Sequence, residues 1–320
     1  MGRSKFLDSI RNELRRQNYS WRTVNAYVGW ARRLVRYCGY KHPRNISPEE
    51  IASFLNYLAV QRQVAASTQN QALCALVFLY REVLDHELPL LENLKRAKKP
   101  RRLPVVLTRE EVKLILCNLD GIPKLVAQLL YGSGLRISEA LRLRVQDVDL
   151  SYRQITVRSG KGDRDRHTVL PAAVVPALKQ ALARRKVLHD RDTRRGCGRV
   201  VLPKALARKY PGEDTRFRWQ YLFPSRRVAK DAQTGILHRY HLSDSFIQRA
   251  VKEAVDRSGI AKRASCHTFR HSFATHLLQD GYDIRTVQEL LGHNNVKTTM
   301  VYTHVLNKGG RGVNSPVDNL

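Results

Sequence analysis

Apolar residues recur at helical spacing through most of the first 84 positions of the chain. The pattern predicts four helices between residues 6 and 84. The third begins at Ser47-Pro48-Glu49-Glu50, where Ser47 is placed to cap the helix and Glu50 to complete a capping box. Residues 1–85 are therefore predicted to form a small all-helical domain with arginines on its polar faces, of which Arg33 is a candidate DNA contact.

The helical pattern breaks between residues 86 and 107, where three prolines accompany a cluster of Lys and Arg. This composition predicts an extended basic linker that can lie along a phosphate backbone. A charged linker that is merely solvated is the alternative. The candidate DNA contacts of the linker are Lys98, Lys99, Arg101 and Arg102.

Residues 108–320 are predicted to form a second domain of mixed structure. Thr108 and Glu111 have the spacing of a capping box, and two β-like runs flank Gly160-Lys161-Gly162, which predicts a hairpin. The predicted fold class is mainly α with a small antiparallel β-sheet, in which an all-helical N-terminal domain precedes an α+β domain. The predicted strands cover residues 154–158 and 167–170, and the predicted helices cover 109–118, 123–131, a short helix through Leu141, 172–188, 243–257, 268–279, 283–291 and 295–304.

The chain is strongly basic along its whole length. Its 57 Lys and Arg against 28 Asp and Glu give a net charge of +29, and the excess is present both before and after residue 107. Such a charge favours a polyanionic partner, with nucleic acid as the leading candidate. A hydrophobic content of 42% excludes a disordered chain.

Several other functional classes are disfavoured by the sequence. Apolar runs fall short of the ~20 residues that span a bilayer, and the N-terminus lacks a secretory signal pattern. Five scattered cysteines indicate reduced thiols, so a cytoplasmic location is expected. His267 and His271 share a helix face, but Arg270 between them disfavours a metal ion, and the glycine motifs do not match a nucleotide-binding loop. No metal and no cofactor are expected.

What remains is a set of phosphate-binding residue types in the second domain. Arg136 stands at a turn-to-helix junction with Glu139 nearby to orient it, and His267 and Arg270 lie one helical turn apart. His293 follows a helix end, and Tyr302 comes nine residues later. Arginine forks match phosphate oxygens in two-point contacts, and a tyrosine near this pocket is a candidate nucleophile.

These residues resemble the tyrosine recombinase (phage-type integrase) family. Arg136, Lys161, His267-x-x-Arg270, Leu291-Gly292-His293 and Tyr302 stand in the order and spacing of the family, and the resemblance covers about residues 10 to 305. It implies a core-binding and a catalytic domain that form a C-shaped clamp around DNA. It also implies that Tyr302 forms a 3′-phosphotyrosyl bond, without ATP or metal.

The other catalytic roles are assigned to the same set. Arg136 and Arg270 are predicted to hold the phosphate, and His267 is the candidate base for Tyr302. By resemblance, Lys161 is the general acid for the 5′-hydroxyl and His293 an additional donor to the phosphate. Glu139 is a supporting residue.

Within the family, residues 189–221 are similar to the extra segment of integron integrases, which insert and excise gene cassettes. This segment combines nine Lys or Arg with four aromatic residues, a composition that suits unpaired bases. By resemblance, it should bind extrahelical bases of a folded single-stranded site, with Trp219 as the first candidate; a small aromatic core is the alternative. Lys209, Arg218 and His241 are further candidate DNA contacts.

The resemblance further implies a homotetramer on two DNA sites, working at the bacterial nucleoid. Only 18 residues follow Tyr302, so the contact that joins neighbouring protomers is not evident from the sequence. Two alternatives stay open. One is a type IB topoisomerase, which would rejoin the same strand, and the other is a DNA-binding regulator without catalytic activity.

Overall fold

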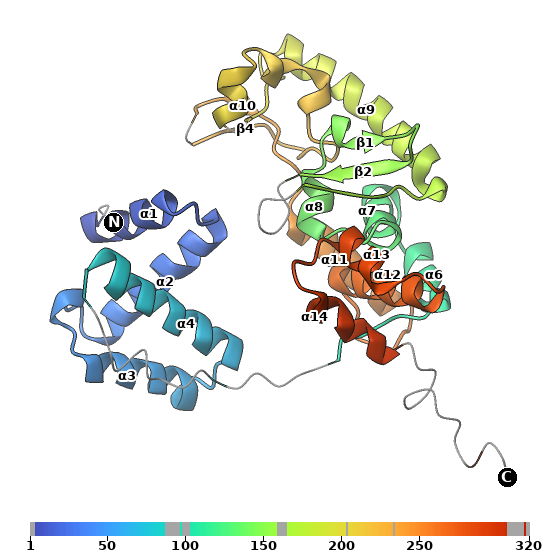
Figure 1. The fold of residues 1–320 in the computed structure, drawn as a ribbon. Helices are drawn as coiled ribbons and strands as arrows, with labels where there is room; N and C mark the ends of the chain where they lie inside the picture. Colours follow the sequence, from blue (N-terminus) through green and yellow to red (C-terminus); the bar gives the residue numbers. More distant parts are fainter. Residues whose placement is uncertain are drawn as a thin grey trace. The chain divides into compact units, whose positions relative to one another are not determined.

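The computed structural model describes residues 4–86, 97, 103–158, 165–202, 204–232, 234–305 and 317. The chain divides into two compact units, Met1–Arg102 and Leu103–Leu320 (Figure 1). The predicted contacts Lys98, Lys99, Arg101, Arg102 and Lys161 lie outside the described residues. In the described ranges, no helix combines the length and apolar character needed to span a membrane.

The described residues of the first unit form four α-helices, as the sequence predicts. The capping box at Ser47 is present, with reciprocal hydrogen bonds between Ser47 and Glu50 of 3.3 and 2.9 Å. Arg33 is exposed, and its guanidinium lies 4.5 Å from the centroid of the Trp30 ring. The helices are α1 (Lys5–Arg16), α2 (Trp21–Tyr37), α3 (Pro48–Asn56) and α4 (Ala66–Phe78), with a 3-10 turn at Pro43–Asn45 and π-helical turns at Tyr57–Gln61 and Leu79–Val83.

Where it is described, the second unit is mainly helical with two small antiparallel sheets. Its helices are α6 (Arg109–Cys117), α7 (Gly121–Gly132), α8 (Ile137–Arg142), α9 (Val175–Arg194), α10 (Lys204–Lys209), α11 (Asp244–Arg257), α12 (Cys266–Gln279), α13 (Ile284–Leu291) and α14 (Val296–Thr299). Its strands are β1 (Val148–Asp149), β2 (Gln154–Val157), β3 (Arg166–Val169), β4 (Ala229–Lys230) and β5 (Leu237–His238). The 3-10 turns are Val145–Asp147, Ala172–Val174, Glu213–Thr215, Phe217–Trp219 and η8 (Met300–Val305).

The predicted hairpin is confirmed as the pair β2 and β3. The two strands are antiparallel, with Ile155 opposite Thr168, and β1 adds a third strand on the other side of β2. The sequence did not predict β1, because a two-residue strand is too short to show an alternating pattern. The predicted helix at residues 295–304 is shorter than expected, since only α14 is α-helical and the chain continues as η8.

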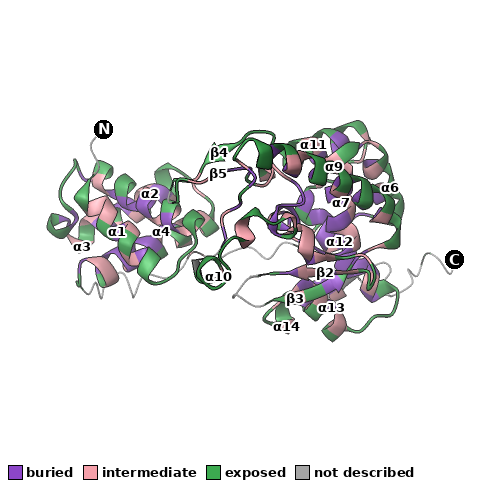
Figure 2. Cartoon of the chain, turned by 90° about the horizontal axis from the view of Figure 1, so that it is seen from above, coloured by how far each residue is buried: buried purple, intermediate pink, exposed green. Residues whose placement is uncertain are grey.

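Helices α7 and α12 form the centre of the second unit (Figure 2). Buried apolar residues concentrate on both, among them Val126 and Leu130 on α7 and Phe269 and Ala274 on α12. The predicted capping box of α6 is present at Thr108. Burial of this face fixes α12, the helix that carries Arg270 and His271.

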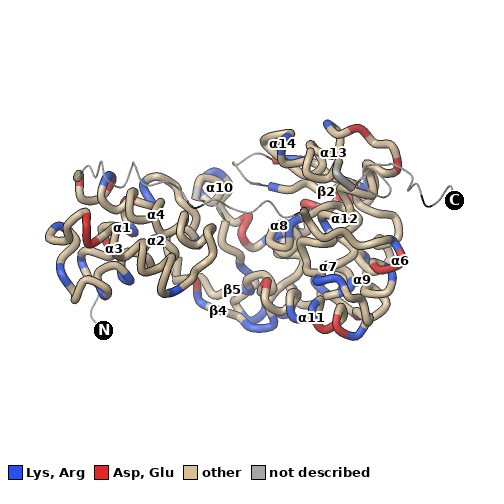
Figure 3. The backbone as a smooth tube through the Cα atoms, turned by 90° about the horizontal axis from the view of Figure 1, so that it is seen from below, with Lys and Arg blue, Asp and Glu red and all other residues tan. Residues whose placement is uncertain are grey.

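The 189–221 segment begins within a helix, because α9 continues to Arg194 beyond the predicted end at residue 188. Two buried polar contacts join α9 to the chain that follows. Arg239 forms an ion pair with Asp192 at 2.6 Å, and the Arg185 guanidinium donates to the Tyr221 carbonyl at 2.9 Å. Lys and Arg recur along this part of the chain, including α10 and the neighbourhood of β4 (Figure 3).

A glycine links α7 to α8 immediately before the candidate site. Gly134 has φ +62°, and a Cβ built there would lie 2.4 Å from the ring of Phe273 on α12. We expect Gly134→Ala to lower the free energy of unfolding by about 2–4 kcal/mol. Of this loss, about 1 kcal/mol comes from the left-handed backbone conformation and about 1–3 kcal/mol from overpacking against Phe273. Urea denaturation measures the loss.

Gly259 provides the matched control for this prediction. Its φ is +69°, but a Cβ would meet no atom within 4 Å, so Gly259→Ala should cost only the backbone contribution of about 1 kcal/mol. Equal losses in the two variants would show that contact with Phe273 does not constrain the turn.

Candidate active site

The first part of the site is formed at the start of α8. Arg136 is the N-cap residue of this helix, and Glu139 accepts from the Arg136 backbone N–H at 2.9 Å and from its guanidinium at 2.6 Å. The carboxylate therefore holds the arginine in place, as the sequence predicts for Glu139. The Arg136 side chain remains 23% exposed, so part of it is accessible to a ligand.

A second arginine, Arg166 at the start of β3, was not predicted. Its guanidinium donates to both oxygens of Glu139, at 3.1 and 2.7 Å, and to the Leu290 carbonyl at 3.0 Å. Burial acts to raise the pKa of Glu139, but the hydrogen bond and charge of Arg166, together with the contacts of Arg136, lower it to about 2. Glu139 is therefore ionised at neutral pH.

Arg270 on α12 is the most deeply buried of the three arginines. Its guanidinium donates to the carbonyls of Gly134 and Leu291, the latter at 2.6 Å, and lies 3.7 Å from Glu139. Burial lowers the pKa of Arg270 to about 9, and the charge of Arg136 acts in the same direction. Arg270 is still charged at pH 7.

Three guanidinium groups thus surround one carboxylate. The cluster of Arg136, Arg166, Arg270 and Glu139 carries a net charge of +2. Because a phosphodiester carries one negative charge and a pentacoordinate phosphorane-like state carries about two, the excess charge suits the transition state of phosphoryl transfer. The cluster can hold a phosphate and stabilise the charge that develops on it.

His293 lies next to Arg270, after the end of α13. Its Nε2 is 3.2 Å from an Arg270 nitrogen and its Nδ1 is 3.0 Å from the Thr299 hydroxyl. Because arginine can only donate, Nε2 accepts and Nδ1 carries the proton. Burial, followed by the charges of Arg270 and Arg136, lowers the pKa of His293 to about 4, so the imidazole is neutral.

Tyr302 lies in η8 beside these groups and is 4% exposed. Its hydroxyl is 2.8 Å from Nδ1 of His271, and its ring stacks on that of His293 with centroids 6.3 Å apart. Burial raises the pKa of Tyr302, whereas the charges of Arg270 and Arg136 lower it. The phenol is therefore protonated at rest and lies within the field of the arginine cluster.

The hydrogen bond of Tyr302 differs from the prediction, in which His267 is the base. His267 is exposed in the first turn of α12, whereas His271, four residues further on, faces Tyr302. Both histidines lie near the same helix face, so the sequence alone could not show which of them reaches the tyrosine. The structure brings together Arg136, Glu139, Arg270, His293 and Tyr302 of the predicted set.

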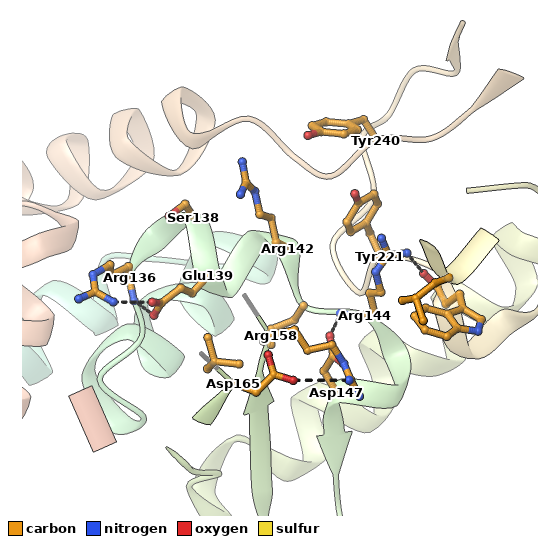
Figure 4. A pocket seen from close by; sticks show the side chains of 14 residues that line it. Arg136, Ser138, Glu139, Arg142, Arg144, Asp147, Arg158, Asp165, Tyr221 and Tyr240 are labelled. Atoms are coloured by element: carbon orange, nitrogen blue, oxygen red, sulfur yellow. Dashed lines mark hydrogen bonds and ion pairs between the residues drawn. The ribbon is translucent and has the colours of Figure 1, made fainter. Parts of the chain in front are cut away.

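A cavity of about 800 Å³ extends from Arg136 toward the 189–221 segment (Figure 4). Arg136 and Glu139 lie at one side of the cavity, and Tyr221 and Tyr240 at the other. Tyr240 is 46% exposed, so its ring is available to a ligand. Three further arginines line the cavity, namely Arg142, Arg144 and Arg158, and the sequence did not single them out.

The prediction that Trp219 contacts an unpaired base is not supported by its position. Trp219 is only 9% exposed and packs in a small core with Val200, Leu202 and Tyr221. Its indole N–H donates to Glu213 at 2.7 Å, which satisfies its polar group. The alternative that the aromatic residues form a small core therefore holds for Trp219, although its edge lines the cavity.

The remaining candidate DNA contacts lie in varied surroundings. Arg218 is 60% exposed and paired with Glu213 at 2.6 Å, and Lys209 lies 5.3 Å from the ring centroid of Tyr210. His241 packs against Tyr240 with ring centroids 4.2 Å apart and an interplanar angle of 34°. Within the described ranges, no group of three His, Cys, Asp or Glu could hold a metal ion.

Comparison with known proteins identifies the family. A model of the phage integrase family matches residues 105–308, and a model of the phage integrase N-terminal SAM-like domain matches residues 6–90. An integrase/recombinase of Escherichia coli is 48% identical over 316 residues, which cover 99% of this chain and 94% of the relative. The tyrosine recombinase XerA of Thermococcus onnurineus is 35% identical over 289 residues, covering 88% and 84% of the two chains.

Solved structures share the fold. The Tn1549 transposon integrase in complex with transposon right end DNA has a TM-score of 0.63 at 17% identity, covering 98% of this chain and 96% of that one. The XerH recombinase in a post-cleavage complex with palindromic difH has a TM-score of 0.59 at 22% identity, covering 90% and 78%. This chain therefore shares the fold of these two proteins. The chain belongs to the phage integrase family and is a tyrosine site-specific recombinase, which cuts and rejoins DNA.

Proposed function

We propose that this recombinase is an integron integrase, which inserts and excises gene cassettes and acts on both duplex and folded single-stranded DNA sites. The observation that carries its chemistry is the +2 cluster of Arg136, Arg166, Arg270 and Glu139 beside the Tyr302 hydroxyl. In this proposal, Tyr302 attacks the scissile phosphorus and forms a 3′-phosphotyrosyl ester. The energy of the broken bond is kept in that ester, so neither ATP nor metal is required.

The other catalytic roles are assigned to the arginine cluster, His293 and Lys161. Arg136 and Arg270 hold the two non-bridging phosphate oxygens. His293, which accepts a hydrogen bond from Arg270, is an additional polar group beside the phosphate. Lys161 protonates the departing 5′-oxygen, an assignment that rests on its place in the sequence motif. Strand rejoining reverses these steps, since the 5′-hydroxyl of a partner strand attacks the phosphotyrosyl phosphorus.

DNA is the proposed partner, and charge is the main physical support. A net charge of +29 spread over both units favours a polyanion, in keeping with a clamp of the two units around DNA. The Tn1549 transposon integrase and the XerH recombinase, which share this fold, are solved in complex with DNA. We further propose a homotetramer on two DNA sites, because strand exchange needs four cleaved strands.

Recognition of single-stranded sites is proposed from the cavity between Arg136 and the 189–221 segment. Its volume of about 800 Å³ and its mixture of tyrosines and arginines suit a flipped-out nucleotide, whose base stacks on Tyr240 while its phosphate meets Arg142 or Arg144. Tyr240 takes the role that the sequence assigned to Trp219, because its ring is exposed.

Covalent trapping on suicide substrates tests the proposed function. The protein is incubated with nicked duplex sites and with strand-specific single-stranded hairpins, and SDS-stable adducts are counted on gels. Adducts on hairpins, followed by joined recombinant strands, support an integron integrase. Adducts on duplex with plasmid relaxation but no recombinant product would indicate a type IB topoisomerase, and the lack of any adduct would indicate a regulator.

The stacking role of Tyr240 gives a separate prediction. Tyr240→Ala should weaken cleavage of folded hairpins about 5- to 150-fold, because stacking contributes ~1–3 kcal/mol per base, while cleavage of duplex sites changes little. Adduct formation on matched hairpin and duplex substrates measures the difference. Tyr152→Ala, at another exposed tyrosine of the same unit, is the control. Equal losses on both substrates would place Tyr240 outside base recognition.

A further inference from the structure

We propose that His271 is the base that removes the Tyr302 proton during DNA cleavage and returns it during rejoining. The proposal rests on Tyr302 being the nucleophile, as proposed above. His271 thus takes the role of base in place of His267, although it lies outside the His267-x-x-Arg270 motif. The group concerned touches the reacting atom directly, since Nδ1 of His271 lies 2.8 Å from the Tyr302 oxygen.

The geometry of the pair favours proton transfer over simple packing. The two rings have centroids 5.5 Å apart and are tilted by 46°, so they are not stacked face to face, and Nδ1 of His271 is within hydrogen-bond distance of the hydroxyl. A heavy-atom distance of 2.8 Å is within the range required of a general base. His271 is fixed on α12 next to Arg270, so the same helix presents both the base and a phosphate-binding group.

The surroundings of His271 keep the imidazole able to accept a proton. Burial, followed by the charges of His267 and Arg270, lowers its pKa to about 4. His293 and Tyr302 are the other titratable groups beside it. A neutral imidazole with its proton on Nε2 accepts the hydrogen bond of the Tyr302 hydroxyl through Nδ1.

DNA binding reduces the difference in proton affinity between His271 and Tyr302. A scissile phosphate adds negative charge beside His271, which favours the imidazolium form, whereas the arginines favour the phenolate form of Tyr302. The resting protein therefore keeps the proton on Tyr302, and the bound substrate promotes its transfer. This arrangement restricts the nucleophile to the DNA complex.

Each proton that moves in this step has a donor and an acceptor. As the Tyr302 oxygen bonds to phosphorus, its proton moves to Nδ1 of His271, and the bond from phosphorus to the 5′-oxygen breaks with protonation of that oxygen by the general acid. During rejoining, the 5′-hydroxyl attacks, the bond from phosphorus to Tyr302 breaks, and the imidazolium returns its proton to the phenol oxygen. No redox partner or co-reactant is involved.

The test compares His271→Asn with His267→Asn in single-turnover cleavage. Asn places its Oδ1 near the position of Nδ1, so it can hold the Tyr302 hydroxyl but cannot take its proton. A substrate with a 5′-bridging sulfur removes the need for a general acid and isolates the tyrosine side of the reaction. We expect His271→Asn to cleave about 10²–10⁴-fold more slowly, and His267→Asn to change far less.

The pH profile separates a base from a positioning residue. We expect the wild-type rate to level off through neutral pH, whereas the His271→Asn rate should rise tenfold per pH unit up to the pKa of the phenol. His276→Asn is the matched control, because His276 makes the same contact on the same helix, from Nδ1 to the Tyr131 hydroxyl at 2.8 Å, outside the arginine cluster. It should leave the profile unchanged.

The possible results distinguish the assignment of the base from the assignment of the nucleophile. If His271→Asn cleaves at the wild-type rate with the wild-type profile while Tyr302→Phe forms no adduct, His271 is not the base and the proposed function still stands. If His267→Asn shows the slow, rising profile instead, His267 is the base. If Tyr302→Phe retains the adduct, the nucleophile and its base are both wrongly assigned.

Discussion

Tyr302→Phe will bind recombination sites with near wild-type affinity and form no detectable covalent adduct. The substitution removes one oxygen, the atom that would bond to phosphorus, and leaves the ring in place against His293. The hydroxyl makes one hydrogen bond, with His271, so the loss of folding free energy should be about 1 kcal/mol. Fluorescence anisotropy measures the binding, and SDS gels of suicide-substrate reactions measure the adduct.

The control for this prediction is Tyr282→Phe. Tyr282 lies in the same unit and is 55% exposed, so loss of its hydroxyl should change neither binding nor adduct formation. A phosphotyrosyl adduct in the Tyr302→Phe protein would exclude Tyr302 as the nucleophile. Digestion of the wild-type adduct and sequencing of the DNA-linked peptide would then locate the true one.

Arg270→Lys is also expected to slow DNA cleavage strongly. Lysine keeps the charge but loses the planar fork. Its single ammonium group cannot donate to the carbonyls of Gly134 and Leu291 and to a phosphate oxygen at the same time. We expect single-turnover cleavage to fall about 10²–10³-fold, as when one preorganised donor to a transition state is lost. Affinity for duplex should change by less than tenfold, because many other cations contact the backbone.

Two measurements keep this result interpretable. Urea denaturation reports whether the buried carbonyls that lose a donor destabilise the fold, since Arg270 is only 4% exposed. Arg257→Lys is the matched variant, because Arg257 also donates to a backbone carbonyl, that of Asn118 at 2.7 Å, but on an exposed part of α11. Wild-type cleavage by a folded Arg270→Lys protein would contradict the role of the guanidinium fork.

Local patterns in the sequence predict most of the helices and part of the site. The capping boxes at Ser47 and Thr108 are present because each depends on residues only three positions apart. Arg136, Glu139, Arg270, His293 and Tyr302 could be singled out because their residue types, order and spacing along the chain form a recognisable motif. Helix ends fixed by packing, such as that of α9, could not be predicted in this way.

The residues that the sequence did not identify depend on long-range packing. Arg166 in a short strand looks like any other surface cation until β3 is placed against Glu139 and the end of α13. His271 differs from His267 only in the direction that α12 presents to η8. Trp219 has the composition of a base contact, yet Val200 and Leu202, which bury it, are more than 15 residues away in the chain.

The buried contacts of α9 have a consequence for any attempt to shorten this enzyme. Asp192 is 2% exposed and depends on Arg239 for its counter-charge, while Arg185 depends on acceptors at Tyr221 and Gln220. A truncation that trims the chain between α9 and α11 would strand both ions in a nonpolar interior, and an orphaned buried ion costs about 3–5 kcal/mol. The region is therefore not a detachable module, and a minimal recombinase built from this scaffold needs apolar replacements at both helix positions.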